Sequence, residues 1–251
     1  MAPASVADAP VALFDLDGTL VDSAPGIIRC LALTLRHYGA DVPPDARLRG
    51  AVGPPVPETL QRLTGFDAEG TAEVVAYYRR LYLQRGIDES SVFPGVREML
   101  DGLRSAGLRL AVATSKRRSH AVAILELHGL AAAFEAVCGA NEDESGSAKA
   151  EVVARALAAV RDAGTLPRPI MVGDRSHDVA GARAHDLPAL FAEWGYGDPS
   201  EGADADWSAA SPARAAEILR EALVEARAPG PAEESSAPTD PPAPSSSSPT
   251  V

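Results

Sequence analysis

The sequence predicts an α/β fold, with a doubly wound parallel-sheet core and a small helical unit inserted after the first strand. Apolar runs of strand length at residues 11–13, 108–113 and 170–172 alternate with segments of helical periodicity. Each run leads directly into acidic or hydroxyl side chains, and open parallel sheets bind ligands at that edge. By contrast, residues 24–91 contain helical patterns and turns but no strand pattern.

The composition excludes several classes of protein. The 251 residues are 46% hydrophobic and 23% charged, as in a soluble protein with one substantial core and a smaller accessory unit. The net charge of −12 disfavours a nucleic-acid polymer or a membrane as partner, because the average field attracts neither. Cys30 and Cys138 lack metal-binding spacing, so we expect reduced thiols. Residues 1–14 show no signal-peptide pattern, so we expect a cytoplasmic protein. Either a monomer or a homodimer is expected.

The first polar cluster directly follows the first expected strand. Asp15 and Asp17 stand two positions apart, so in an extended chain their side chains point the same way. Two close carboxylates repel each other unless a cation or a proton intervenes. The pattern indicates a nucleophile, an acid/base neighbour and a divalent metal, although a bare Asp-x-Asp-Gly is also typical of a solvated turn.

The inserted unit, residues 24–91, consists of helical patterns. Apolar side chains recur at helical spacing in residues 27–35 and 74–82, and a shorter helix is expected near residues 58–63. The rigid turn formed by Gly53, Pro54 and Pro55 lies in the connection before that shorter helix. Such a unit is either a structural connector or a cover that excludes water and selects the substrate.

Hydroxyl side chains and a lysine mark two further candidate sites along the chain. Thr114 and Ser115 end the second expected strand, where their hydroxyls and the backbone N–H groups of the next helix could bind phosphoryl oxygens. A Thr-Ser pair there is also a common helix N-cap. Lys149 lies in the first turn of a later expected helix, where the helix dipole disfavours a cation, so a functional role explains it better than a solvated face.

A second acidic pair follows the strand at residues 170–173. Asp174 and Asp178 are four positions apart, which places them on one face at the start of a helix. Carboxylate oxygens suit Mg²⁺, whereas the neighbouring His177 is a poor ligand for it. His120 and His128 have no partner motif, and solvent-exposed or helix-end positions are expected for them.

The rest of the chain completes the expected layout. Residues 187–192 predict a last core strand, residues 194–197 a Gly-rich loop at the pocket rim or core edge, and residues 211–226 a final helix. The Pro- and Ser-rich residues 228–251 predict a disordered tail. The predicted domains are therefore a core of residues 1–23 and 92–227, a helical unit of residues 24–91, and this tail.

Together these stretches resemble the four motifs of the haloacid dehalogenase-like (HAD) hydrolases. The residues are Asp-x-Asp-Gly-Thr-Leu-Val-Asp-Ser from Asp15, Thr114 after its strand, Lys149, and Gly-Asp-x-x-x-Asp at residues 173–178. The resemblance covers about residues 10–226. It implies a Rossmann-like core, and it implies that residues 24–91 are the helical cap of the phosphoglycolate phosphatase-like subclass.

The resemblance also implies a role for each motif residue. Asp15 would be the nucleophile that becomes an aspartyl phosphate, and Asp17 would protonate the leaving oxygen and then activate water. The implied phosphate-binding residues are Thr114, Ser115 and Lys149; the implied Mg²⁺ ligands are Asp15, Asp17, Asp174 and Asp178; the implied substrate-specificity loop is Gly53, Pro54 and Pro55.

The implied function is Mg²⁺-dependent hydrolysis of a phosphate monoester, with a small phosphorylated metabolite as substrate, as in phosphoglycolate phosphatases. A 5'-nucleotidase acting on nucleoside monophosphates remains an alternative, as does a β-phosphoglucomutase-like isomerase. A signalling domain that is phosphorylated on Asp fits less well, because there the phosphorylated Asp follows a later strand and no cap intervenes. A catalytically silent binding protein is disfavoured because no motif residue is missing.

Overall fold

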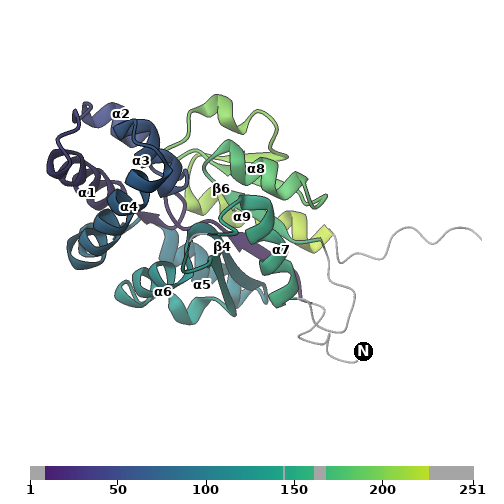
Figure 1. Cartoon of the computed structure of the whole chain (residues 1–251). Helices are drawn as coiled ribbons and strands as arrows, with labels where there is room; N and C mark the ends of the chain where they lie inside the picture. Colours follow the sequence, from purple (N-terminus) through teal and green to yellow (C-terminus); the bar gives the residue numbers. More distant parts are fainter. Residues whose placement is uncertain (1–8, 144, 161–167, 226–251) are drawn as a thin grey trace, which may run out of the picture.

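The computed structural model describes residues 9–143, 145–160 and 168–225 and shows an α/β core with a helical unit at one end (Figure 1). The core contains a six-stranded parallel sheet with the strand order β5-β4-β1-β6-β7-β8. This arrangement confirms the predicted doubly wound fold. The strands are β1 (Val11–Phe14), β4 (Arg109–Arg117), β5 (Ala136–Ala140), β6 (Ile170–Gly173), β7 (Ala189–Ala192) and β8 (Trp207–Ala209).

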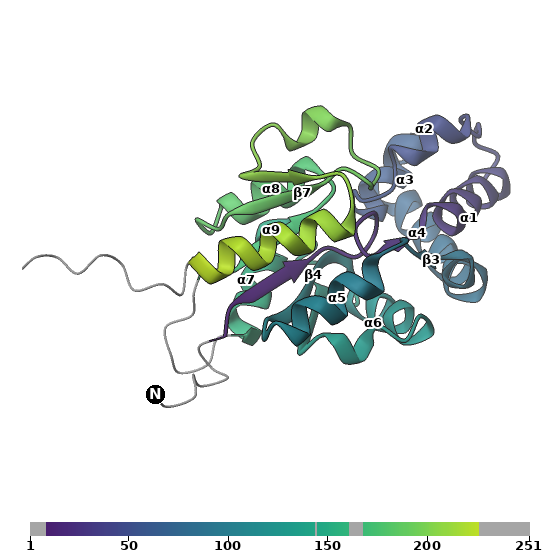
Figure 2. The ribbon, with the colours of Figure 1, turned by 180° about the vertical axis from the view of Figure 1, so that it is seen from behind.

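Helices cover both faces of the sheet. On one face lie α5 (Val96–Ser105), α6 (Arg118–Leu127) and α9 (Pro212–Glu225), of which α5 and α9 are in front in Figure 2. On the other lie α7 (Lys149–Val160) and α8 (Ser176–Arg183). Successive side chains of a strand point to opposite faces, so Phe14 packs in the first layer and Leu13 in the second. The central strand β1 is therefore buried on both sides, which fixes where its carboxyl end lies.

The helical unit leaves and rejoins the core through a short antiparallel pair, β2 (Val21–Asp22) and β3 (Ser91–Val92). We refer to residues 24–90 as the cap, because its helices lie over the carboxyl edge of the sheet (Figure 1). The two-residue strands were not predicted, since two residues carry no periodicity. The cap elements are α1 (Ala24–His37), α2 (Asp45–Arg49), α3 (Val56–Thr64), α4 (Ala68–Leu81), the π-helix η2 (Tyr82–Gly86) and the 3₁₀ turn η3 (Ile87–Glu89).

The second strand is longer than predicted. Strand β4 continues through Thr114 to Arg117, where it still pairs with Ala140 of β5 after a register shift. The next helix begins only at Arg118, and its N-cap position, Arg117, makes no side-chain capping bond. The alternative in which Thr114 or Ser115 caps this helix is therefore wrong, because both residues lie within strand β4, between its pairs with β5 at Ala113 and Arg117.

Two predictions fall partly or wholly outside the described residues. The tail at residues 228–251 lies outside them, as does the end of the helix that opens near Lys149, which its sequence pattern predicts to run to about residue 163. Within the described part, Cys30 and Cys138 are free thiols. None of the described helices combines the length and the apolar character needed to cross a membrane.

Candidate active site

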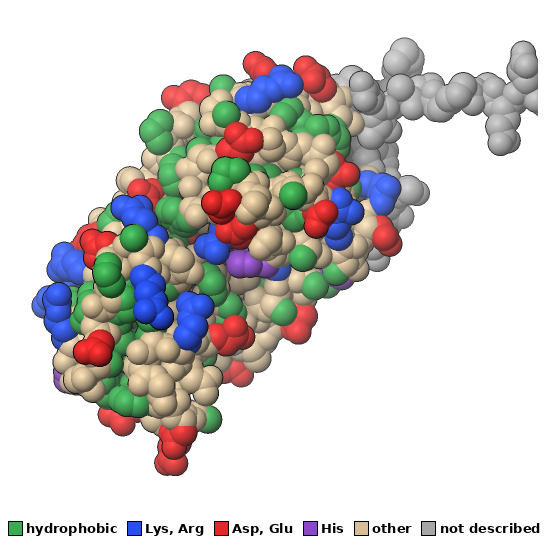
Figure 3. Space-filling model, turned by 90° about the horizontal axis from the view of Figure 1, so that it is seen from above, with side chains coloured by type: hydrophobic (Ala, Val, Ile, Leu, Met, Phe, Trp, Pro, Cys, Tyr) green, Lys and Arg blue, Asp and Glu red, His purple; other side chains and the backbone are tan. Residues whose placement is uncertain are grey.

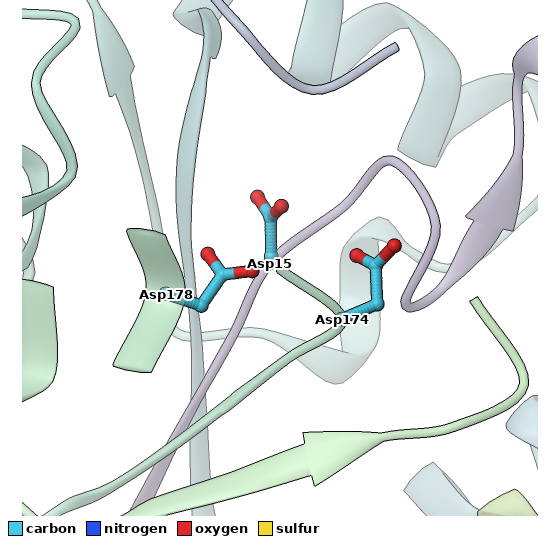
Figure 4. Close-up of side chains that lie close together, drawn as sticks. All are labelled: Asp15, Asp174 and Asp178. Atoms are coloured by element: carbon cyan, nitrogen blue, oxygen red, sulfur yellow. The ribbon is translucent and has the colours of Figure 1, made fainter. Parts of the chain in front are cut away.

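Three carboxylates converge at the carboxyl edge of the sheet (Figure 4). Asp15 follows β1 and donates its backbone N–H to the Val172 carbonyl of the neighbouring strand β6 at 2.9 Å. Asp174 follows β6, and Asp178 lies in the first turn of α8. One oxygen from each carboxylate lies within 4.8 Å of the others, and all three residues are buried. Parallel pairing of β1 and β6 thus brings together acids that are far apart in the sequence.

Lys149 enters this acidic cluster from the first turn of α7. Its ammonium lies 2.8 Å from Asp15 Oδ1 and 2.7 Å from Asp178 Oδ1, and it donates to the Ala113 carbonyl at 3.1 Å. Burial alone would lower the pKa of Lys149, but the two carboxylates raise it above its usual value. The helix carrying Lys149 packs closely on α8, since a Cβ on Gly181 would lie 2.5 Å from Lys149 Cγ. The ammonium is therefore charged and held in place.

The acidic cluster has more negative charge than Lys149 can balance. Burial raises the pKa of Asp15, with Lys149 opposing that shift, and burial raises the pKa of Asp174 well above its usual value. Asp174 makes no ion pair among the described residues; it accepts hydrogen bonds from Thr19 Oγ1 at 3.1 Å and from the Tyr196 backbone N–H at 2.8 Å. A buried, oxygen-only set with excess negative charge fits a hard divalent cation such as Mg²⁺.

The Asp17 carboxylate has different partners and lies outside the acidic cluster. Lys116 Nζ lies 3.0 and 2.9 Å from its two oxygens, and the Ser23 hydroxyl donates to Oδ1. Sequence analysis expected Asp17 beside Asp15 from the geometry of an extended chain, but the chain turns here. The Leu20 backbone N–H donates to the Leu16 carbonyl at 3.0 Å. The structure therefore does not bring this carboxylate to the other expected metal ligands.

The predicted hydroxyl residues lie near the end of β4, directly before Lys116. Thr114 is buried, and its hydroxyl accepts the Lys116 backbone N–H at 3.3 Å. Ser115 and Lys116 line the adjoining cavity. Lys116 was missed in the sequence because a lysine before an expected helix looks like a solvated charge; its position directly after Thr114 and Ser115 was the available signal.

A small cavity separates the cap from the core beside Asp17. Its volume is about 60 Å³, and Gly53, Pro54 and Pro55 line it, where the resemblance places a specificity loop. Lys and Arg side chains gather over the cap on the face shown in Figure 3. The other lining residues are Ile27, Ala51, Val56, Tyr78, Arg79 and Tyr82 from the cap, and Asp17, Ser115, Lys116, Arg117, His120 and Ser147 from the core.

Histidines and the Gly-rich loop occupy partly unexpected places. His120 lies in the first turn of α6, in agreement with the helix-end expectation, but it is only 6% exposed and lines the cavity rather than facing solvent. His128 ends α6 as predicted, with Nε2 2.8 Å from Ser90 Oγ. Residues 194–197 pack at the core edge rather than around the cavity, and Trp194 Nε1 donates to the Thr19 carbonyl at 2.9 Å.

The sheet, the acidic cluster at its carboxyl edge and the lysine within it define an α/β enzyme with an aspartate at the end of its first strand. Comparison with known families gives the same answer, since residues 12–192 match the model described as haloacid dehalogenase-like hydrolase. The chain belongs to the haloacid dehalogenase-like hydrolase family. The resemblance predicted from the four motifs is thereby confirmed.

Relatives within this family differ in their named activities. The tyrosine-protein kinase PtkA of Mycobacterium tuberculosis is 47% identical over 186 residues, which are 74% of this chain and 62% of that protein's length. A phosphoglycolate phosphatase of Caulobacter vibrioides is 37% identical, covering 77% and 83% of the two chains. A 5'-nucleotidase of Pseudomonas aeruginosa is 34% identical, covering 76% and 86%.

The fold of this chain is similar to that of a solved structure over nearly the whole length of the solved protein. A predicted phosphatase from Clostridium acetobutylicum superposes with a TM-score of 0.77 at 32% identity, covering 86% of this chain and 99% of the other. The core and the cap therefore both have counterparts in a single known structure. This likeness defines the architecture, whereas the reaction depends on the residues at the acidic cluster of this chain.

Proposed function

We propose that the protein is a Mg²⁺-dependent phosphate monoester hydrolase that acts on a small phosphorylated metabolite. The observation that carries this proposal is the buried cluster of Asp15, Asp174, Asp178 and Lys149 at the carboxyl edge of the sheet. It places a nucleophilic carboxylate, a fixed cation and a set of hard oxygen donors at one point. The family supports hydrolysis, and the phosphatase relatives support a phosphate ester as substrate.

The mechanism begins with Asp15. One of its carboxylate oxygens attacks phosphorus, and the bond from phosphorus to the leaving oxygen breaks as an acyl phosphate, the aspartyl phosphate, forms on Asp15. Mg²⁺ held by Asp15, Asp174 and Asp178 would offset the negative charge of the acids and of the phosphate. Lys149 neutralises the same region, and the hydroxyls of Thr114 and Ser115 hold the phosphoryl oxygens. A water then attacks the aspartyl phosphate, which releases inorganic phosphate and regenerates Asp15.

Asp17 handles the protons in both steps. It gives a proton to the leaving alkoxide, and it takes one from the attacking water in the second step. In the structure Asp17 is ion-paired with Lys116, an arrangement that suits the base of the second step. Proton donation in the first step requires Lys116 to release Asp17, and an incoming phosphate offers the ammonium another anion.

The size of the cavity favours a small leaving group. Its volume of about 60 Å³ is well below the roughly 300 Å³ at which pockets for drug-sized ligands begin. A nucleoside or a hexose needs more room than this closed arrangement provides, which weighs against the 5'-nucleotidase and isomerase alternatives. A phosphoglycolate phosphatase-like activity is therefore the form of the proposal that we favour.

Protein-tyrosine phosphorylation is a second candidate, because the tyrosine-protein kinase relative is 47% identical to this chain. Carboxylates around Mg²⁺ serve kinases as well as phosphatases. The chain corresponds to only 62% of that relative's length, and a tyrosine side chain would also need more room than the cavity provides. The test below includes this activity.

The test is a phosphate-release assay with Mg²⁺, comparing 2-phosphoglycolate with nucleoside monophosphates and repeated with excess chelator. We expect release from 2-phosphoglycolate that the chelator abolishes. Asp15→Asn should lower this rate by about 10⁴-fold or more, with an unchanged circular dichroism spectrum. Conversion of a sugar phosphate without phosphate release would favour the isomerase, and phosphorylation of a tyrosine peptide by ATP would favour the kinase. Activity retained in Asp15→Asn would refute the nucleophile assignment.

A further inference from the structure

Two buried polar side chains line the cavity, Tyr82 from the cap and His120 from the core. The Tyr82 hydroxyl makes no hydrogen bond of good geometry with the described residues, and the neighbouring Lys116 ammonium lies over its ring. We propose that Tyr82 and His120 form a subsite that binds a carboxylate on the leaving group of the substrate. This inference rests on the proposed phosphatase function and deepens it, since it assigns the residues that select the substrate.

Tyr82 is held with its hydroxyl buried. It is 2% exposed and opens the π-helix η2, a wide turn of a kind often found at functional sites. Gly86 allows the ring to lie there, since a Cβ on Gly86 would come within 2.3 Å of Tyr82 Cδ2. A buried hydroxyl without a partner costs free energy, and native proteins keep few of them. A ligand that pairs with the hydroxyl would remove this cost.

His120 approaches the same point from the first turn of α6. Its ring centroid lies 5.9 Å from that of Tyr82, and the side chain is 6% exposed. Burial, together with the charges of Lys116 and Arg117, lowers the pKa of His120 to about 4. The ring is therefore neutral at neutral pH, with one N–H donor and one acceptor. Because Tyr82 belongs to the cap and His120 to the core, the pair forms only when the cap is closed.

The charges around the cavity favour an anionic group. Lys116 Nζ lies 4.7 Å from the centroid of the Tyr82 ring, and the guanidinium groups of Arg79 and Arg117 also line the cavity. Lys116 is paired with Asp17, and Arg117 with Glu142 at 3.0 Å. These two cations therefore contribute positive electrostatic potential to the cavity, while their own ion pairs occupy them. A carboxylate is a small anion that accepts hydrogen bonds from both a hydroxyl and an imidazole N–H. The substrate class is therefore a short phosphorylated hydroxy acid.

The experiment uses two substrates that differ only in this group. Ethyl phosphate has a methyl group where 2-phosphoglycolate has its carboxylate. We expect Tyr82→Phe and His120→Ala each to lower kcat/KM for 2-phosphoglycolate by about 10- to 100-fold, and to change that for ethyl phosphate by less than about 3-fold. His120→Asn, which keeps an amide donor, should recover part of the loss. Tyr38→Phe is the matched control, because its hydroxyl contacts Glu73 and not the cavity.

A purely structural role for Tyr82 would give a different result. Removing an unpaired buried hydroxyl should leave the melting temperature of Tyr82→Phe unchanged or higher. If the ratio of the two kcat/KM values stays at the wild-type value in both variants, the inference is overturned while the phosphatase function stands. Preference of the wild-type protein for nucleoside monophosphates would also overturn it.

A binding measurement keeps the two proposals separate if the wild-type protein hydrolyses neither ester. The affinity for 2-phosphoglycolate would then be measured by calorimetric titration of the ligand into the protein in the presence of Mg²⁺. The two proteins compared are Asp15→Asn and the double variant Asp15→Asn, Tyr82→Phe. A 10-fold or greater loss of affinity in the double variant supports the subsite, although the proposed hydrolysis has failed. Equal affinities overturn the subsite.

Discussion

The acidic cluster and the cavity wall formed by Tyr82 and His120 both bury polar side chains, but they differ in how those side chains are paired. In the acidic cluster, Asp15, Asp178 and Lys149 compensate one another's charge at distances below 3 Å. In the cavity wall, Tyr82 and His120 are also buried, and the Tyr82 hydroxyl makes no hydrogen bond of good geometry with the described residues. The acidic cluster is organised before a substrate arrives, whereas the cavity wall still lacks a group that a substrate could supply.

This difference follows from where each set is built. The acidic cluster lies at the ends of β1 and β6 and on the first turns of α7 and α8, which backbone hydrogen bonds and two packed layers hold in place. The cavity wall forms where the cap meets the core, and there Arg175 Nη1 donates to the Val52 carbonyl at 2.8 Å. Under the proposed function, the chemistry would lie at the edge of the sheet and substrate selection at the contact between cap and core.

The largest effect should come from removing the cation of the acidic cluster. Lys149→Met leaves Asp15 and Asp178 buried without their partner, so we expect the free energy of unfolding to fall by about 3–5 kcal/mol at neutral pH. Phosphate release should be lost as well. Urea denaturation without metal measures the change, and added Mg²⁺ should restore part of the stability because it supplies positive charge to the same oxygens.

Lys116→Met is the matched control for this prediction. Lys116 is also ion-paired, but with Asp17 alone and at the edge of the cavity, where water can approach the freed carboxylate. Its loss of stability should be clearly smaller. Equal stabilities of Lys149→Met and the wild-type protein would show that the acids of the cluster are already protonated or solvated, contrary to the charged ion pairs described above.

A smaller effect should appear in the pH dependence of stability through His120. Its pKa is about 4 in the folded protein against 6.5 for an ordinary histidine, so between these values the unfolded chain binds a proton that the folded one does not. The contribution is complete above pH 6.5 and is lost as the pH falls towards 4. The difference of about 2.5 between these two pKa values corresponds to at most roughly 3.5 kcal/mol at about 1.4 kcal/mol per unit.

His120→Asn tests this contribution, because the variant should lose the part of the pH dependence of the free energy of unfolding that comes from the imidazole. Charged groups from several elements face the ring: Lys116 and Arg117 on β4, Arg79 on α4 and Glu142 after β5. Urea denaturation at pH 4 to 7.5 should therefore be compared as the difference between wild type and variant, which cancels the other carboxylates. A difference that is constant with pH would mean that the imidazole is already protonated or solvated in the folded state.

The same contrast explains what the sequence could predict. Asp15, Asp174 and Lys149 are readable because each follows a recognisable strand or opens a helix, and parallel strand ends meet at one edge. Tyr82 and His120 give no such signal, since each is a single residue on an amphipathic helix and they meet only through contact between cap and core. Their pairing depends on tertiary structure that no local pattern encodes.

Errors in the prediction have a shared physical cause. Asp17 was placed beside Asp15 by extending the geometry of a strand into a segment that turns at Leu16. Thr114 was considered as a helix cap, although pairing with β5 keeps the chain extended to Arg117. In both cases backbone hydrogen bonds that the assumed local geometry leaves out determined the conformation: a turn closed on Leu16 in the first case and pairing with β5 in the second.

The smallest effect should come from Tyr196, which connects the two regions. Its backbone N–H donates to Asp174 in the acidic cluster, whereas its hydroxyl donates to Asp22 Oδ1 at 2.8 Å and accepts the N–H groups of Ser23 and Ala24. The latter three residues lead into the cap. Tyr196→Phe keeps the ring and the bond to Asp174 but removes the connection to the cap. We expect the free energy of unfolding to fall by about 1–2 kcal/mol.

The distinguishing measurement is local. Hydrogen exchange at the amides of Ser23 and Ala24 should accelerate in Tyr196→Phe, while that of β1 stays unchanged, because only the first group loses an acceptor. With a looser cap, KM for 2-phosphoglycolate should rise a few-fold while ethyl phosphate, which does not need the cavity wall, is hydrolysed as before. Equal changes for both substrates would mean that Tyr196 acts on the acidic cluster itself. The contact between cap and core at Tyr196 would then not be specific to substrate selection.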